Sequence, residues 1–167
     1  GLSRWLMFHL DGPVYNKRFI SKSSSAAISK LASLTLPASF EFLHLDVDDF
    51  YMVGSPHHLA KNVSMLMQSQ LRALAYDAVQ FLVKNALLEV GPLNVILQSI
   101  SGSGQGLPHS SILANAAFMW AIELMGPGIA LARFQISLGI VFYTKYADNL
   151  LCMLMVSQAR DNLVASF

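Results

Sequence analysis

The chain has 167 residues, of which 54% are hydrophobic and 13% charged, and its formal net charge is +1. Soluble domains carry about 25% charged residues, so this composition excludes a disordered chain, a coiled coil and a polybasic nucleic-acid tail. The single cysteine, Cys152, excludes an intramolecular disulfide and a four-cysteine zinc site. The length fits one domain with a real hydrophobic core.

The apolar content does not predict a membrane protein. A membrane-spanning helix needs about 20 uninterrupted apolar residues. The best window, residues 113–132, is interrupted by Asn115, by Glu123 and by the Gly126-Pro127-Gly128 run. The opening residues lack a convincing signal-peptide cleavage site. We therefore expect no membrane partner. We attribute the high apolar fraction to surfaces that would be buried inside something larger.

Charge is distributed unevenly along the chain. Residues 1–40 carry five basic residues and one acidic residue, whereas residues 41–167 carry six basic and nine acidic residues. Asp46, Asp48 and Asp49 lie within four positions. A basic flank beside an acidic cluster suits a phosphorylated substrate held with a divalent metal. A solvated basic face and an ordinary turn explain the same counts.

Hydrophobic periodicity predicts alternating strands and helices. Residues 21–30 are rich in Ser and fit either a linker or the start of a helix. The remaining segments, in chain order, are a strand at 40–47, a long helix with Leu59, Val63, Leu66, Leu71 and Leu74 on one face, a helix at about 76–88, a hairpin at 87–100, a loop at 102–110, a helix at 111–125 and a hairpin at 136–156 with residues 145–149 as its polar tip. This mixture indicates an α+β fold.

Two carboxylates stand at strand ends in this scheme. Asp46 ends an apolar strand, and Asp148 lies in the turn of an apolar hairpin. If these strands pair in one sheet, the carboxylates lie side by side and repel each other unless a cation neutralises them. Hard oxygen ligands favour Mg²⁺, which takes further ligands from water and substrate phosphates. The sequence therefore predicts a site for phosphoryl chemistry with Mg²⁺, with Mn²⁺ as an alternative.

Three segments carry a family resemblance. LHLDVDDFYMV (43–53) resembles motif A of reverse transcriptases, with the metal-binding Asp and an aromatic residue five positions later. GSGQGLPHSSILAN (102–115) is similar to motif B, and YTKYADNLL (143–151) resembles the Tyr-x-Asp-Asp turn of motif C. The order and spacing of the three fit a reverse-transcriptase palm over residues 40–156. The phrase VKNALLEV is most similar to Penelope-like and other non-long-terminal-repeat retroelements.

The resemblance implies roles for individual residues. Asp46 and Asp148 match the carboxylates that hold two metal ions, and Val47 matches a carbonyl ligand of one ion. Asp49 matches a position whose amide meets the triphosphate, and Tyr51 matches the aromatic gate beneath the sugar. The other matching positions are Gln105 and Gly106 at the template and incoming base, Asn149 as the second motif C position, and Lys17, Arg18 and Lys22 as basic residues of the fingers.

The resemblance also implies an organisation and partners. Residues 1–40 would be partial fingers and residues 41–167 the palm, with the thumb absent. The implied partners are an RNA template, a DNA primer and a deoxynucleoside triphosphate. The implied location of the protein is inside the cell, in the nucleus. The implied activity is that of an RNA-directed DNA polymerase, a nucleotidyltransferase of retrotransposons.

Asn149 departs from the family pattern. An amide oxygen coordinates a metal without adding charge, so metal affinity should fall, although Asp48 could compensate if the strand continues through both Asp46 and Asp48. A catalytically degenerate domain that binds nucleic acid or acts as a scaffold is therefore an alternative. An RNA-dependent RNA polymerase palm is a third reading, against which Tyr51 argues because such enzymes need a smaller or polar gate.

Overall fold

The structure, a computed structural model, describes residues 1–17, 19–36, 39–104, 106–124 and 139–155. By its internal contacts the chain forms two units. The first, which we call the helical unit, is Gly1–Val14 with Asp49–Ile122, and the second, the sheet unit, is Tyr15–Asp48 with Glu123–Phe167. The division into partial fingers and palm at residue 40 is a functional assignment and stays a prediction.

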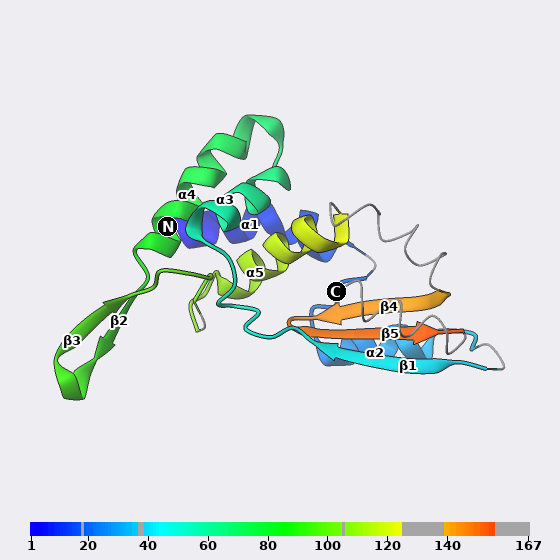
Figure 1. The fold of residues 1–167 in the computed structure, drawn as a ribbon. Coiled ribbons are helices and arrows are strands. Elements are labelled where there is room, and N and C mark those ends of the chain that lie inside the picture. Colours follow the sequence, from blue (N-terminus) through cyan, green and yellow to red (C-terminus); the bar gives the residue numbers. More distant parts are fainter. Residues whose placement is uncertain (18, 37–38, 105, 125–138, 156–167) are drawn as a thin grey trace. The chain divides into compact units, whose positions relative to one another are not determined.

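The sheet unit is built on three antiparallel strands in the order β1-β5-β4 (Figure 1). These strands are β1 (Glu41–Asp46), β4 (Ile140–Tyr146) and β5 (Asn149–Leu154). The predicted strand at 40–47 and the predicted hairpin at 136–156 are thereby confirmed over the described residues. Apolar side chains of the central strand, including Leu150, Cys152 and Leu154, are buried. Cys152 is a core residue, as its apolar surroundings predict.

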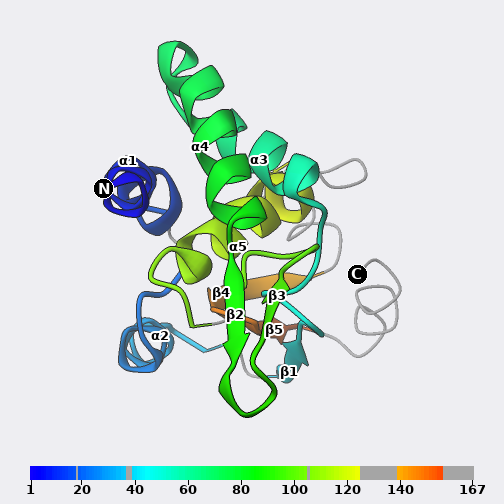
Figure 2. The ribbon, with the colours of Figure 1, turned by 90° about the vertical axis from the view of Figure 1, so that its left-hand side faces the viewer.

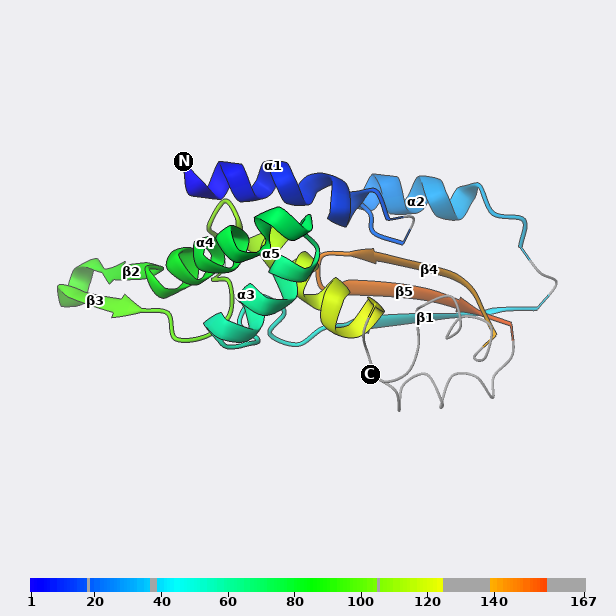
Figure 3. The same ribbon diagram turned by 90° about the horizontal axis from the view of Figure 1, so that it is seen from above.

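Helix α2 (Ser24–Ala32) packs beside β4 in the same unit (Figure 3). Ser23 is its N-cap, and the Ser23 hydroxyl accepts a hydrogen bond from the amide of Ala26. This cap satisfies one of the unpaired amides of the first helical turn. The Ser-rich segment at 21–30 is therefore a helix start and not a linker.

The helical unit contains α1 (Leu2–Tyr15, whose last residue belongs to the sheet unit), α3 (Pro56–Met65), α4 (Arg72–Lys84) and α5 (Ser110–Phe118). Helix α5 continues as the π-helix η3 (Met119–Leu124), whose last two residues belong to the sheet unit. Figure 2 shows α3 and α4 side by side. Their contact faces bury small and β-branched residues such as Ala60, Val63, Ala75 and Val79. The predicted helix at 111–125 is confirmed apart from its change of helical type.

The predicted long helix through residues 59–74 is wrong. Helix α3 ends at Met65, and Gln68 adopts an extended backbone before the short 3-10 helix η1 (Ser69–Leu71). Leu74 then lies 52% exposed on α4. The apolar periodicity of the sequence runs on across this break and therefore gives no sign of it. The break is set by the packing of α3 against α4, which requires the chain to reverse and which a local pattern does not reveal. The predicted helix at 76–88 likewise ends at Lys84.

The predicted hairpin at 87–100 is confirmed as β2 (Leu87–Val90) and β3 (Val95–Gln98), joined by η2 (Gly91–Leu93). Asn94 adopts a left-handed backbone at the turn. Figure 1 shows the ribbon extending away from the helices of its own unit. No helix within the described residues is long and apolar enough to cross a membrane.

Candidate functional site

The end of β1 and the β4–β5 turn lie next to each other in the sheet unit. Asp46, the last residue of β1, is the register partner of Asn149, the first residue of β5. The Val47 amide donates a hydrogen bond to the carbonyl oxygen of Asp148 at 3.0 Å. Ala147 has a left-handed backbone with φ 52°, which tightens the turn. The fold therefore brings together the two segments that resemble motif A and motif C, as expected if the two apolar strands pair in one sheet.

The side chains at this end of the sheet form a hydrogen-bonded series. The Asn149 Nδ2 atom donates to Asp148 Oδ1 at 2.8 Å. The Asn149 Oδ1 atom lies 2.8 Å from His44 Nε2. Asp46 and Asn149 are exposed and Asp148 is half-buried, so the acidic oxygens are open to solvent and solutes.

The donor set fits a hard cation such as Mg²⁺. Asp46 and Asp148 carry carboxylate oxygens and Val47 a backbone carbonyl, the types of ligand that Mg²⁺ prefers together with water. Within the described ranges, neither carboxylate has a Lys, Arg or His ion-pair partner. The same ranges contain no group of three or more His, Cys, Asp or Glu arranged around a metal. A cation here would complete its shell with backbone, water and substrate oxygens.

Asp48 does not lie on an extension of β1. The strand ends at Asp46, and a turn begins at Asp48, so strand alternation does not place both carboxylates on one face. The proposed compensation for Asn149 by Asp48 therefore loses its geometric basis. Asp49 begins the helical unit with φ 52°, and its carbonyl accepts hydrogen bonds from the amides of Met52 and Val53.

Tyr51 is held against the motif B loop inside the helical unit. The Tyr51 carbonyl accepts a hydrogen bond from the Ser103 amide at 2.7 Å. Gly102 approaches so closely that a Cβ atom there would lie 2.2 Å from the same carbonyl oxygen. The Tyr51 ring packs edge-on against Phe50 with centroids 5.2 Å apart. This loop therefore fixes the backbone of the predicted sugar gate.

The motif B loop is also tied to the start of α5. The Ser110 hydroxyl donates to the Ser103 carbonyl at 2.9 Å, and the Ser103 hydroxyl donates to the Ser110 carbonyl at 3.2 Å. Gly106 has φ +87° and open space where a Cβ would stand. Gln105 lies outside the described residues. The loop is thus anchored at both ends.

The structure does not test the roles predicted for the basic residues of the fingers. Lys17 is exposed, and Arg18 lies outside the described residues. The Lys22 ammonium lies 5.1 Å from the centroid of the Tyr15 ring. This distance is that of a cation–π contact. Their role at a triphosphate stays a prediction.

A buried polar network lies behind the motif C hairpin. Lys145 is fully buried, and its Nζ atom lies 3.7 Å from Glu123 Oε1. The Tyr143 hydroxyl donates to the same oxygen at 2.7 Å. Burial lowers the pKa of Lys145 to about 8, and the Glu123 charge partly opposes this shift. Burial raises the pKa of Glu123, and burial together with the Glu123 charge raises that of Tyr143.

This network corrects the view of Lys145 as part of a polar hairpin tip. The sequence shows Lys145 near Tyr146 and Asp148, whereas in the structure its pairing with Glu123 offsets part of the cost of burying a lysine. His44 was also missed. It precedes Asp46 by two positions, so strand alternation was the available signal that both share a face.

His109 is a further buried polar residue, in the helical unit. Its side chain is 4% exposed, and Nδ1 lies 3.0 Å from the Ser3 hydroxyl oxygen. The Nε2 atom has no hydrogen-bond partner among the described residues. Burial lowers the pKa of His109. The adjacent residues His57 and His58 instead lie in the first turn of α3, as expected for a helix start.

Comparison with known proteins places the fold. No protein-family model matches the chain, and no curated protein matches it either. Among solved structures, it is similar to apo telomerase from Candida tropicalis truncated from the C-terminal domain, with a TM-score of 0.65 and 11% identity. The match covers 99% of this chain and 36% of the telomerase chain.

The chain therefore shares its fold with this part of the telomerase chain, which supports a distantly reverse-transcriptase-like fold. The α+β architecture with an antiparallel sheet is compatible with a polymerase palm, as the sequence predicts. At 11% identity the likeness concerns the fold alone. The Penelope-like assignment gains no support from it.

Proposed function

We propose that the chain is the palm, with part of the fingers, of an RNA-directed DNA polymerase. The observation that carries this proposal is the pairing of β1 with β5, which sets Asp46 opposite Asn149 and beside Asp148. A reverse-transcriptase-like fold and three motifs in register support the same conclusion. The parent would be a nuclear retroelement protein of Penelope-like or related type.

The reaction would transfer a nucleotidyl group from a deoxynucleoside triphosphate to the 3′-hydroxyl of a DNA primer on an RNA template. Asp46, Asp148 and the Val47 carbonyl would hold Mg²⁺ or Mn²⁺, which supplies the positive charge that an in-line phosphoryl displacement needs. Tyr51 would exclude a ribose 2′-hydroxyl, and the amide of Asp49 would meet the triphosphate. Gln105 and Gly106 would contact the template and the incoming base, and Lys17 and Arg18 the triphosphate.

A specific observation favours the degenerate alternative. The second motif C position is an amide, and its oxygen already lies at hydrogen-bond distance from His44. A site with two carboxylates holds a divalent cation less tightly than a site with three. In this alternative the chain binds nucleic acid or acts as a scaffold without synthesis.

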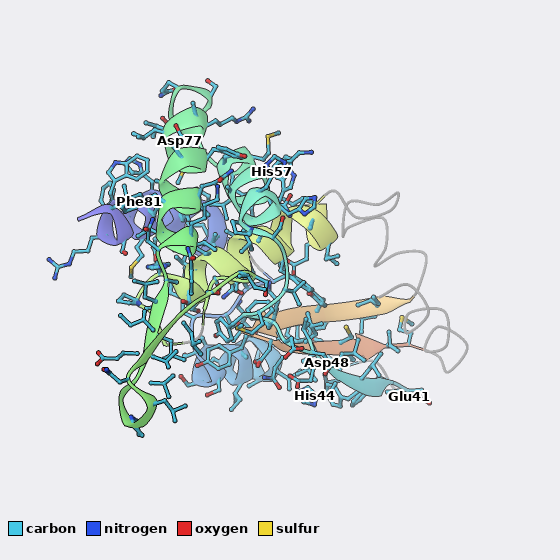
Figure 4. The ribbon with its side chains drawn as sticks, turned by 60° about the vertical axis from the view of Figure 1, so that its left-hand side comes forward. Glu41, His44, Asp48, His57, Asp77 and Phe81 are labelled. Atoms are coloured by element: carbon cyan, nitrogen blue, oxygen red, sulfur yellow. The ribbon has the colours of Figure 1, made fainter. Side chains whose placement is uncertain are left out.

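Manganese titration tests the proposed metal site. Primer extension then distinguishes the polymerase from the catalytically degenerate domain. The backbone amides of residues 46–48 and 147–149 should broaden on addition of paramagnetic Mn²⁺, and Asp148→Ala should abolish the broadening. Asp77→Ala, an exposed acid on α4 labelled in Figure 4, is the matched control and should broaden like the wild type. Primer extension equal to that of Asp148→Ala would contradict catalysis, and Mn²⁺ binding without extension would favour the degenerate domain.

A further inference from the structure

We infer that His44 and Asn149 form a hydrogen-bonded couple that positions the Asp148 carboxylate. Asn149 then acts through Asp148 and is a positioning residue, not a ligand. The inference rests on the proposed function, because it concerns a carboxylate assigned to metal binding. Nothing in the resemblance to reverse transcriptases assigns a role to His44.

Strand register places His44 and Asn149 within reach of each other. His44 pairs with Leu151, and Asp46 pairs with Asn149, so His44 and Asn149 are diagonal neighbours on adjacent strands. Diagonal neighbours on one face of an antiparallel pair lie close enough for long side chains to touch. The 2.8 Å approach of His44 Nε2 to Asn149 Oδ1 is such a contact.

The direction of each hydrogen bond follows from the chemistry of Asp148. An ionised carboxylate only accepts hydrogen bonds, so the Asn149 atom facing Asp148 Oδ1 must be the NH₂ group. The amide oxygen therefore faces His44. Since that oxygen also only accepts, His44 Nε2 must carry the proton that is donated to it.

This arrangement explains what an amide does at position 149. A carboxylate in the same place would set two negative oxygens against each other, whereas the amide donates to one and leaves the other Asp148 oxygen without this bond. The His44 donor holds the amide in the required orientation. Groups that orient metal ligands through hydrogen bonds commonly change metal affinity 10–100-fold when removed.

The surroundings of the couple allow it to be tested without disturbing the core. His44, labelled on β1 in Figure 4, is exposed and lines an open groove of about 380 Å³ together with Asn149, Ile28 of α2 and Leu151. Substitution of His44 removes the donor and leaves the buried face of the sheet intact. His44→Leu removes the donor, and His44→Gln retains an N–H that can reach the same oxygen.

The first test uses the metal-free ¹⁵N-labelled chain in EDTA. The Asn149 side-chain amide signals, assigned by their loss in Asn149→Ala, should shift in His44→Leu and exchange with water several times faster. His44→Gln should restore the wild-type signals. His57→Leu, an exposed histidine on α3 with one side-chain hydrogen bond, is the control and should leave them unchanged. Unchanged Asn149 signals in His44→Leu would overturn the inference.

The second test measures the dissociation constant for Mn²⁺ by electron paramagnetic resonance. His44→Leu should weaken binding about three- to tenfold, less than at buried sites because the couple is exposed, and His44→Gln should stay within about twofold. Equal affinity in His44→Leu and wild type, or loss in both variants, would overturn the positioning role. If the wild type binds no Mn²⁺, the proposed function fails, and the metal-free amide signals alone decide whether the couple exists.

Discussion

Asp46 on β1 lies directly opposite Asn149 on β5, at the point where the sheet ends. Asp148, which precedes Asn149 in the β4–β5 turn, accepts a backbone hydrogen bond from Val47 and a side-chain hydrogen bond from Asn149. The neutral Asn149 therefore stands opposite one acidic residue and donates a hydrogen bond to the other. A negative charge at position 149 would add electrostatic repulsion with Asp46 and Asp148 at this end of the sheet.

Asn149→Asp should have opposite effects with and without metal. Without metal, a carboxylate opposite Asp46 and next to Asp148 should lower the free energy of unfolding by about 1 kcal/mol, because like charges directly opposite on a sheet repel. With Mn²⁺ the same charge should tighten binding and stabilise the fold by ligand linkage. Urea unfolding in EDTA and in Mn²⁺ measures both effects.

Asn149→Ala serves as the control for this pair of measurements, because it removes the amide without adding charge. It should not tighten Mn²⁺ binding. If Asn149→Asp were as stable as wild type in EDTA and bound Mn²⁺ no more tightly, the proposed site at this end of the sheet would be wrong.

Gly102→Ala should be strongly destabilising. Gly102 has φ +70°, and a Cβ there would lie 2.2 Å from the Tyr51 carbonyl oxygen and 2.4 Å from the Met52 Cα. Both obstacles are backbone atoms, so the loop and the turn must separate, at a cost of about 3 kcal/mol or more. Thermal unfolding of the variant measures this loss.

Two other glycines separate steric overlap from backbone strain. Gly106 has φ +87° but open space around a Cβ, so Gly106→Ala should lose only about 1–2 kcal/mol. Gly91 has neither feature, and Gly91→Ala should be close to neutral. Equal losses at Gly102 and Gly106 would contradict the close approach of the motif B loop to Tyr51.

Lys145→Met should lower the free energy of unfolding by about 3–5 kcal/mol at pH 7, because removal of one partner leaves Glu123 buried without its counter-charge. The double variant Glu123→Gln/Lys145→Met should recover much of this loss, since neither position then carries a buried charge. Chemical denaturation of wild type, both single variants and the double variant forms the required cycle. Lys84→Met, at an exposed position, should change stability by less than about 0.5 kcal/mol.

His109 should make the protein less stable in mild acid. Its folded-state pKa is lowered by burial, so below its ordinary pKa the unfolded chain binds more protons than the folded one. Stability is therefore lost as the pH falls through about 6.5 toward the folded-state pKa, by at most about 1.4 kcal/mol per pH unit for one proton. Urea unfolding at pH 7.5 and pH 5.5 measures the loss.

His109→Asn removes this titration and keeps a polar group that can meet the Ser3 hydroxyl. The difference in unfolding free energy between pH 7.5 and pH 5.5 should be smaller in the variant than in the wild type. An identical difference would show that His109 is not the residue responsible.

The sequence by itself determined the elements with strong local signals. Alternation around Phe42 and His44 predicted β1, and the Gly91-Pro92 turn and the polar break at residues 145–149 predicted the two hairpins. A strand's period of two is visible within six residues. The positions of Asp46 and Asp148 at the ends of apolar strands also led to the expectation that, if these strands pair, both carboxylates share one end of a sheet. These are properties of short segments and of their order along the chain.

Only the tertiary structure decided which polar side chains meet. The end of α3 at Met65 depends on how the chain packs and not on a local signal. The contacts of Lys145 with Glu123 and of Gly102 with Tyr51 join residues that are distant in sequence. The His44–Asn149–Asp148 series depends on strand register, where a slip by one residue would turn His44 to the other face. Hydrogen bonds and burial act over a few ångströms in space, so their partners are fixed by packing and register, which no local pattern specifies.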